Sequence, residues 1–176
     1  MPDAGSAADF DAFYLATSRR VLGHVYAVTG NLAEAEDAVA EAYLRAWNHW
    51  RSVRAADSPE AWVRRVATRA AISAWRKAMN RVRAHHRAAT DEALDDLSPD
   101  HVALVDALRR IPLAQRRTIV LHHLAGLSVE QVAREMGCPA GTVKARLARG
   151  RQALARQLSD RPAGRGERTG GRDGRR

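Results

Sequence analysis

Apolar residues recur at steps of three and four along most of this 176-residue chain, and this spacing is the strongest constraint on its fold. Between residues 31 and 50, for example, Ala35, Val39, Ala42, Ala46 and Trp50 follow one side of a helix. No segment shows the sustained apolar and polar alternation, bounded by turn residues, that is typical of a strand. The sequence therefore predicts an all-α protein.

Local signals mark where the helices of the first half begin and end. Gly30 breaks the first helix, and Asn31 with Glu34 resembles a capping box for the second. Ser58 is the expected N-cap of the third helix. Pro59 then takes the first helical position, where its missing N–H costs nothing. We expect helices over residues 9–28, 31–50 and from 59 to the 81–87 region, with Trp47, Trp50 and Trp75 mainly as packing residues.

The net charge of +9 hides a strong segregation of charge along the chain. Residues 1–50 carry 3 basic and 7 acidic side chains, residues 51–90 carry 10 and 2, residues 91–100 carry none and 5, and residues 101–150 carry 8 and 3. Apolar residues thin out in the acidic segment, and the chain beyond Leu158 is rich in glycine and arginine. We divide the chain into two small helical domains, 1–87 and 101–158, a flexible acidic linker, 88–100, and a disordered basic tail, 159–176.

Composition and motifs exclude several classes of protein. One cysteine rules out a disulfide scaffold, and the absence of a long apolar run or a leader pattern predicts a soluble cytoplasmic protein without a membrane partner. Adjacent His85 and His86, like His122 and His123, point to different sides of a helix and are poor metal sites. Cys138 has no evident base and no phosphate-binding loop is present, so we predict neither an enzyme nor a cofactor. A pI near 11 favours a polyanionic partner, nucleic acid before an acidic membrane.

The most specific local motif is a helix-turn-helix over residues 127–158. Ser128 is an N-cap with Gln131 at its third helical position, and Gly137 suits the left-handed end of that helix. Ala133 is small where the two helices must approach each other. In this motif the second helix enters the major groove of DNA, whereas the alternative is a helical hairpin whose basic side is merely solvated. The expected buried stripe of the second helix is Val143, Leu147, Leu154 and Leu158.

These motifs resemble those of a known family. Residues 111–117, 125–128, 132–133 and 141–151 are similar to the fourth conserved region of bacterial RNA polymerase sigma factors. Residues 35–41 resemble the second region, and residues 61–67 resemble its promoter-melting segment. Ala40 stands where the family usually has Gln, so the chain departs from the family's pattern at one residue expected to contact polymerase. With two domains and a short linker, the chain resembles the extracytoplasmic-function (ECF) subgroup.

The resemblance implies two DNA-binding surfaces. For the upstream (−35) promoter element it implies the recognition helix, with Ala140, Gly141, Thr142, Lys144, Arg146 and Arg149. For opening the downstream (−10) element it implies the third helix and the loop before it, with Arg51, Arg54, Trp62, Arg65, Arg69, Ser73, Arg76 and Lys77. Arg146 is the candidate for a guanine contact, while Trp62 is a stacking residue or a core residue.

The resemblance also implies protein partners. Core RNA polymerase would dock on the acidic side of the 31–50 helix, at Glu34, Asp37 and Glu41; the alternative is a solvated face. An anti-sigma factor is a further candidate partner. The acidic segment 91–97 is either a connector drawn into basic polymerase channels or a spacer.

The sequence thus predicts a sigma factor that binds core polymerase, recognises the −35 and −10 elements and helps to open the duplex. The alternative is a helix-turn-helix transcriptional regulator that works without polymerase.

Overall fold

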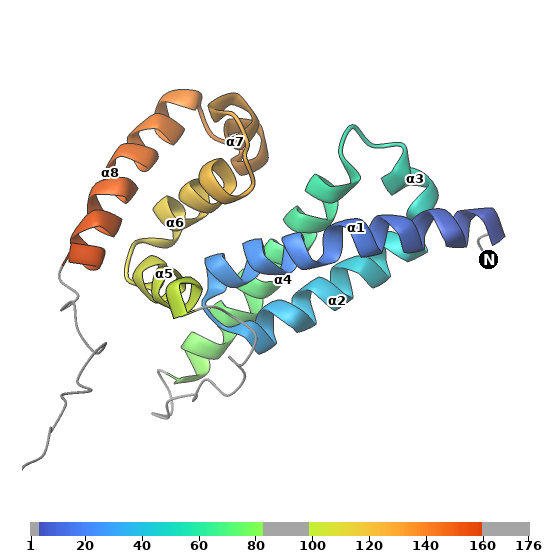
Figure 1. Ribbon diagram of the computed structural model, residues 1–176, viewed down its shortest axis with the longest axis horizontal. Coiled ribbons are helices and arrows are strands. Elements are labelled where there is room, and N and C mark those ends of the chain that lie inside the picture. Colours follow the sequence, from blue (N-terminus) through green and yellow to red (C-terminus); the bar gives the residue numbers. More distant parts are fainter. Residues whose placement is uncertain (1–3, 83–98, 160–176) are drawn as a thin grey trace, which may run out of the picture.

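The computed structural model describes residues 4–82 and 99–159, and every regular element in these two ranges is helical (Figure 1). The predicted all-α class is therefore confirmed. The acidic segment 91–97, the histidines at 85 and 86, and the tail beyond residue 159 lie outside the described residues. No helix in the described part of the chain is long and apolar enough to cross a membrane.

The amino-terminal unit is a bundle of three long helices with one short helix. Helices α1 (Ala4–Thr29), α2 (Leu32–Asn48) and α4 (Pro59–Val82) pack against one another, and α3 (Trp50–Arg54) joins α2 to α4. The Asn31 side chain accepts a hydrogen bond from the Glu34 N–H at 3.1 Å, and Ser58 Oγ accepts one from the Ala61 N–H at 3.2 Å. Both predicted N-caps are confirmed, but the capping box predicted at Asn31 is incomplete, because the Asn31 N–H donates to Thr29 Oγ1 at 3.4 Å and not to the Glu34 side chain.

The short helix α3 was not predicted. The helix expected over 31–50 ends at Asn48, because His49 leaves helical geometry with φ −122° and ψ 23°. This change of direction turns Trp50 into the core, where its side chain is 4% exposed. The same turn places Arg51 and Arg54 on a helix rather than in a loop.

Aromatic side chains cluster in the amino-terminal core, whose other buried residues are valines and alanines. The Phe10 ring centroid lies 5.0 Å from that of Trp47 and 5.2 Å from that of Trp50. Tyr43 is buried and its hydroxyl hydrogen-bonds the Thr17 hydroxyl at 2.7 Å, while burial raises the pKa of Tyr43 to about 12. The packing interpretation holds for Trp47 and Trp50 but is weaker for Trp75, which is 39% exposed on α4.

The carboxyl-terminal unit contains α5 (Pro99–Arg109), α6 (Leu113–Ile119), the π-helical turn η1 (Val120–Leu124), α7 (Val129–Met136) and α8 (Ala140–Ser159). Its core is aliphatic and includes Leu108, Val120, Val132 and Val143. The buried stripe predicted for α8 was wrong at its end, because Leu158 extends past the elements that cover Val143 and is 45% exposed.

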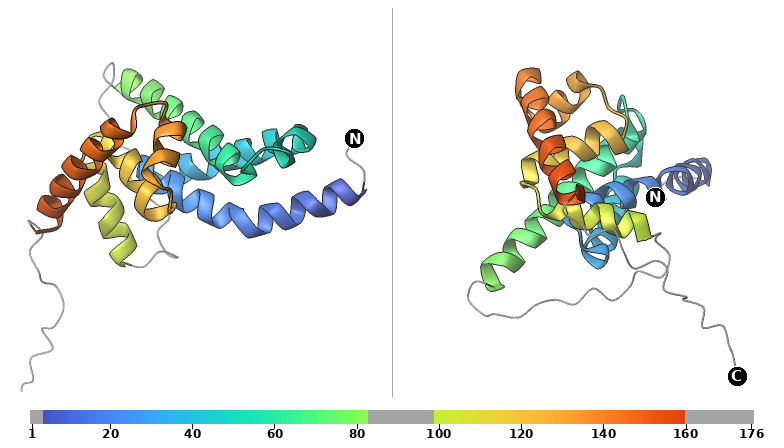
Figure 2. Two further views of the ribbon diagram at one scale, coloured as in Figure 1. Left: turned by 90° about the horizontal axis from the view of Figure 1, so that it is seen from above. Right: turned by 60° about the vertical axis from the view of Figure 1, so that its left-hand side comes forward.

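The two units pack directly on each other (Figures 1 and 2). Ala27, Val28 and Ile72 from the amino-terminal unit belong to the aliphatic core of the carboxyl-terminal unit, and Val105 of α5 belongs to the amino-terminal core. The Arg116 guanidinium on α6 donates to the Val28 carbonyl at 2.7 Å, across the junction. Each core therefore includes residues of the other unit.

Candidate nucleic-acid interface

The α7–α8 pair has the geometry of a helix-turn-helix. Gln131 N–H donates to Ser128 Oγ at 3.2 Å, and the Ser128 N–H donates to the Gln131 side chain at 2.8 Å, which closes the predicted capping box. Gly137 takes the left-handed conformation with φ 62°, and the Cys138 N–H donates to the Ala133 carbonyl at 3.1 Å. The start, the end and the turn of α7 therefore agree with the sequence prediction.

The outer side of α8 carries the residues expected to contact the −35 element. Val143 and Leu147 are buried in the core, and this orients the other residues of the first turns outward. Arg146 is half-buried beside the turn, with one guanidinium nitrogen 3.5 Å from Cys138 Sγ. Of the predicted set, Gly141, Lys144 and Arg149 are exposed, and Ala140, Thr142 and Arg146 are half-buried.

Apart from Trp62, the α4 residues expected to handle the −10 element form one exposed basic face. Arg65, Arg69, Ser73, Arg76 and Lys77 are all exposed on α4. On α3, both predicted arginines are also exposed. The side chain of one of them, Arg54, pairs with Asp9 at 3.1 Å.

Trp62 occupies a different environment from the other residues predicted for the −10 element. Its side chain is half-buried and packs against the amino-terminal core. This placement favours the core interpretation over base stacking in the arrangement that the structure describes.

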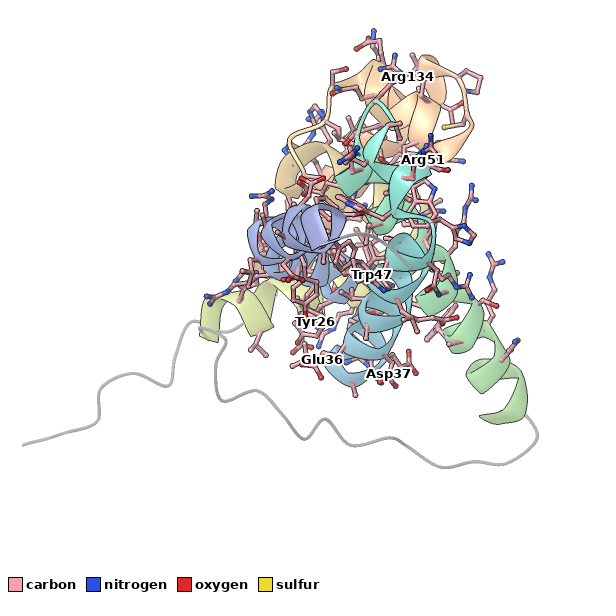
Figure 3. The ribbon with its side chains drawn as sticks, turned by 90° about the vertical axis from the view of Figure 1, so that its right-hand side faces the viewer. Tyr26, Glu36, Asp37, Trp47, Arg51 and Arg134 are labelled. Carbon is pink, nitrogen blue, oxygen red and sulfur yellow. The ribbon has the colours of Figure 1, made fainter. Side chains whose placement is uncertain are left out.

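The acidic side of α2 differs in one position from the prediction. Asp37 and Glu41 are exposed, and Glu41 forms an ion pair with Arg45. Glu34 is half-buried, with its Oε2 atom enclosed and without a hydrogen-bond partner. Glu36, which is next to Asp37 in the sequence, is also exposed. Figure 3 shows both residues low in the view and Arg134 of α7 at its top.

A buried ion pair joins the two units. The Arg64 guanidinium donates to both carboxylate oxygens of Glu135, at 3.2 and 2.7 Å, and the two side chains are 5% and 9% exposed. A fork-to-fork pair of this kind fixes orientation as well as charge. The sequence analysis missed it, although an arginine between the buried Val63 and Ala67 on the apolar side of α4 was a signal.

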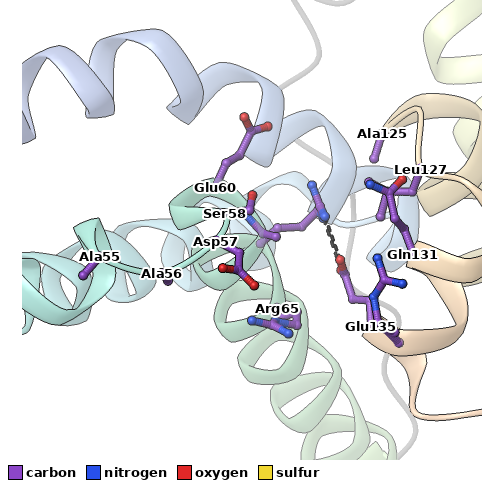
Figure 4. A pocket seen from close by; sticks show the side chains of 13 residues that line it. Ala55, Ala56, Asp57, Ser58, Glu60, Arg65, Ala125, Leu127, Gln131 and Glu135 are labelled. Atoms are coloured by element: carbon purple, nitrogen blue, oxygen red, sulfur yellow. Dashed lines mark hydrogen bonds and ion pairs between the residues drawn. The ribbon is translucent and has the colours of Figure 1, made fainter.

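The ion pair forms one wall of an open cleft between the two units (Figure 4). The cleft has a volume of about 680 Å³ and lies between α7 and the α3–α4 turn. Ala55, Ala125 and Leu127 supply apolar surface, and Arg65 and Gln131 supply polar groups. Clefts at such junctions are common places for ligands.

Burial at the junction also changes how readily its basic groups hold a proton. His24 of α1 is 6% exposed, and this burial lowers its pKa. A hydrogen bond with the Leu124 backbone acts in the opposite direction but is the smaller effect. Burial likewise lowers the pKa of Arg116 and of Arg117 on α6. In the described part of the chain, no group of three or more His, Cys, Asp or Glu side chains is arranged to hold a metal ion.

Comparison with known proteins accounts for this combination of elements. The Sigma-70 region 2 family model matches residues 13–81, and the Sigma-70, region 4 family model matches residues 101–154. The ECF RNA polymerase sigma factor SigM of Mycobacterium tuberculosis is 31% identical over 164 residues, which cover 88% of this chain and 80% of SigM. The chain belongs to the ECF RNA polymerase sigma factors.

Two further similarities support the assignment of this ECF sigma factor. The sigma factor SigW of Bacillus subtilis is 31% identical over 151 residues, covering 77% of this chain and 81% of SigW. Among solved structures, the sigma factor RpoE of Bartonella quintana in complex with the anti-sigma factor NepR superimposes with a TM-score of 0.73. That match has 25% sequence identity and covers 87% of this chain and 99% of RpoE.

In this sigma factor, the region 2 match lies within α1–α4, and the region 4 match runs from α5 into α8. The helix-turn-helix and the basic face of α4 thus fall in different regions of the family. Sigma factors are transcription initiation factors and not enzymes.

Proposed function

We propose that this sigma factor binds core RNA polymerase through α2, reads the −35 element with α8, and opens and holds the −10 element with α4 and the segment before it. The observation that carries the proposal is the helix-turn-helix of α7 and α8. Its second helix buries Val143 and Leu147 and leaves Lys144 and Arg149 exposed. A helix held in this way can enter a major groove with its basic side chains toward the bases and phosphates.

The basic face of α4 supports the second part of the proposal. Removing a base from the duplex costs a few kcal/mol, so the protein must supply phosphate neutralisation while the strand is open. Arg65, Arg69 and Arg76 are exposed along α4, and within the described residues they form no ion pair that would have to be broken first.

The acidic face of α2 supports the polymerase-binding part. Asp37 and Glu41 are exposed on the side of α2 away from the core. They form the exposed part of the proposed docking surface, and Glu34, whose carboxylate is partly enclosed, lies at its edge. Binding to polymerase implies that the protein works in the cytoplasm.

The packed arrangement has a consequence for this function. Two separate promoter elements require the α4 and α8 faces to move apart, and this movement breaks the Arg64–Glu135 pair. The solved RpoE structure that this chain resembles is a complex of the sigma factor with the anti-sigma factor NepR. An anti-sigma partner that holds the two units of this chain together would oppose the same movement.

A reconstituted transcription assay tests the proposal. The protein with core polymerase should give a promoter-dependent transcript from its own regulatory DNA, and core polymerase alone should not. A double D37N/E41Q variant should lose the transcript together with binding to core polymerase, whereas D11N, at an exposed site on α1, should retain both.

The same assay separates the alternative function. Tight binding of the protein alone to this DNA, without a transcript when polymerase is added, would indicate a regulator that works without polymerase and would overturn the proposal.

A further inference from the structure

His24 connects the two units at their junction. It lies on α1, which packs against η1, and its ring forms a hydrogen bond with the Leu124 backbone at the end of η1. Among the described residues, Nδ1 of His24 is enclosed and has no hydrogen-bond partner, so the bond to Leu124 belongs to Nε2. Because that bond raises the pKa of His24, the ring donates it, and Nε2 carries the proton of the neutral ring. A second proton would therefore go to the enclosed Nδ1.

The charges that surround His24 are unbalanced. The ring lines a crevice between the units together with three arginines and one carboxylate from α4, α6 and α7, namely Arg64, Arg65, Arg117 and Glu135. Two further charged groups act on the ring, Arg20 of α1 and Glu60 of α4. In the part of the chain that the structure describes, four cations and two anions thus face the ring.

Both of these carboxylates are already engaged by an arginine. Glu135 accepts hydrogen bonds at both oxygens from Arg64, at 3.2 and 2.7 Å. Glu60 does the same with Arg20, at 3.2 and 2.8 Å. A proton on Nδ1 of His24 would add a buried cation without a free carboxylate, or it would draw Glu135 away from Arg64. Both results weaken the junction, because a buried charge without a partner is strongly unfavourable.

We propose that protonation of His24 separates the two units, so that the junction acts as a pH-sensitive switch. Burial, assisted by the charges of Arg64 and Arg20, lowers the pKa of His24 in the packed arrangement. A ring released by separation regains a pKa near its ordinary value of 6.5. Separation is therefore favoured as the pH falls below 6.5, by up to about tenfold for each pH unit, until the pH passes the pKa of the packed form.

The switch would act on the step at which the packed arrangement opens. Engagement of two promoter elements requires the units to move apart, so acidification would lower the free energy that this movement needs. That consequence rests on the proposed function. The separation itself requires neither polymerase nor promoter DNA, so its test can fail while the transcription assay succeeds, and the reverse.

Thiol labelling of the full-length chain measures the separation. In a Cys138→Ser background, Val105→Cys places a thiol on α5 at a position that is 2% exposed and belongs to the amino-terminal core. H24Q keeps a donor for the Leu124 carbonyl but takes up no proton. The labelling rate with His24, divided by the rate with H24Q at the same pH, cancels the pH dependence of the thiol. With 4,4′-dithiodipyridine as the reagent, we expect this ratio to rise up to about tenfold between pH 7.5 and 5.5.

Two controls identify the group and the movement. H123Q removes an exposed histidine of η1, and the corresponding ratio should not change with pH. Val39→Cys places a thiol in the amino-terminal core, on α2, where separation of the units does not expose it. The thiol at position 105 should react at least about tenfold faster than the thiol at position 39, because a local opening needs less free energy than unfolding.

Three outcomes would overturn the proposal. The ratio for H24Q stays constant between pH 7.5 and 5.5, or the thiols at positions 105 and 39 react at equal rates, which would show exposure by unfolding alone. The third comes from a histidine NMR titration of the unsubstituted chain, which does not depend on the folding of H24Q. A His24 pKa at or above 6.5 would reverse the sign of the pH dependence. A circular dichroism melt checks that each variant folds.

Discussion

The two units of this sigma factor are both helical but are stabilised in different ways. Every Phe, Tyr and Trp of the chain lies between residues 10 and 75, so only the amino-terminal core combines aromatic rings with its valines and alanines. The carboxyl-terminal core has only aliphatic and small side chains, and apart from α8 its own helices have 11 residues or fewer. The first unit closes its core largely with its own residues, while the second borrows Ala27, Val28 and Ile72 from its neighbour.

This difference indicates a division of roles. Large aromatic side chains bury much area each and give a small bundle a rigid core. A unit that completes its core on a neighbour is less stable when it is released. The carboxyl-terminal unit should therefore respond more strongly to changes at the junction than the amino-terminal unit does.

The largest effect is expected from the aromatic core. Trp50→Ala should lower the free energy of unfolding by about 3–5 kcal/mol, because its buried ring contacts Phe10 and Phe13. Chemical denaturation measures this change. The control is Trp75→Ala, on a half-exposed side chain, which should cost about 1 kcal/mol or less. Equal costs would show that the rings are not what holds the first unit together.

The junction is tested by two ion pairs of similar geometry. Glu135→Ala leaves Arg64 buried without a partner and should cost about 3 kcal/mol in denaturant unfolding. Glu60→Ala breaks the Arg20–Glu60 pair, with bonds of 3.2 and 2.8 Å, and should cost less than about 1 kcal/mol because Arg20 is exposed.

The double variant R64M/E135L should recover much of the stability lost in Glu135→Ala, since apolar groups of similar size need no charge partner. If Glu135→Ala lowers the free energy of unfolding no more than Glu60→Ala does, the carboxyl-terminal unit does not depend on the junction for its stability.

DNA reading by the carboxyl-terminal unit is tested at one base. In a complex with core polymerase, Arg146→Ala should weaken binding to the preferred base at one −35 position by about 1–3 kcal/mol and relax the preference there. Arg149→Ala serves as the phosphate-contact control and should weaken all sequence variants alike. If Arg146→Ala also weakens every variant equally, Arg146 contacts phosphate and not a base.

The tight packing of the second unit is tested at a glycine. A Cβ atom at Gly150 would lie 2.8 Å from Ile119 Cδ1, so Gly150→Ala should cost about 1 kcal/mol in thermal unfolding. Gly141 has no atom within 4 Å of the corresponding position, and Gly141→Ala should instead add up to about 0.5 kcal/mol. If both substitutions raise the free energy of unfolding, or both lower it, the result would argue against close contact between α6 and α8.

The smallest expected effect is a pH dependence at the junction. Burial holds the pKa of His24 below its ordinary value of 6.5, so the unfolded chain takes up a proton at a higher pH than the folded chain does. Stability should therefore fall as the pH drops below about 6.5. His24→Gln should flatten this dependence in denaturant titrations between pH 7.5 and 5.5, and His49→Gln, at an exposed site, should not.

Sequence reasoning succeeded where the cause is local. The caps at Asn31, Ser58 and Ser128 each depend on a side chain and an N–H three residues away, and all three are formed. The left-handed end of α7 follows in the same way from Gly137. The exposed faces of α4 and α8 follow from the period of their buried residues.

Prediction failed where the outcome depends on a second element. Glu34 lies on the polar side of α2 by spacing, but its carboxylate is partly enclosed. Leu158 continues the apolar stripe of α8 but extends beyond what covers it. Arg64 was not selected because its partner, Glu135, is 71 residues away.

The sequence by itself determined the helical class, the helix-turn-helix and the separation of charge into acidic and basic faces, because each of these depends on residues within a few turns of one another. Only the tertiary structure decided that each core takes in residues of the other unit and that Arg64 and Glu135 join the two units. Those features depend on contacts between distant segments, and the periodicity of a single helix carries no information about which face of another helix will cover it.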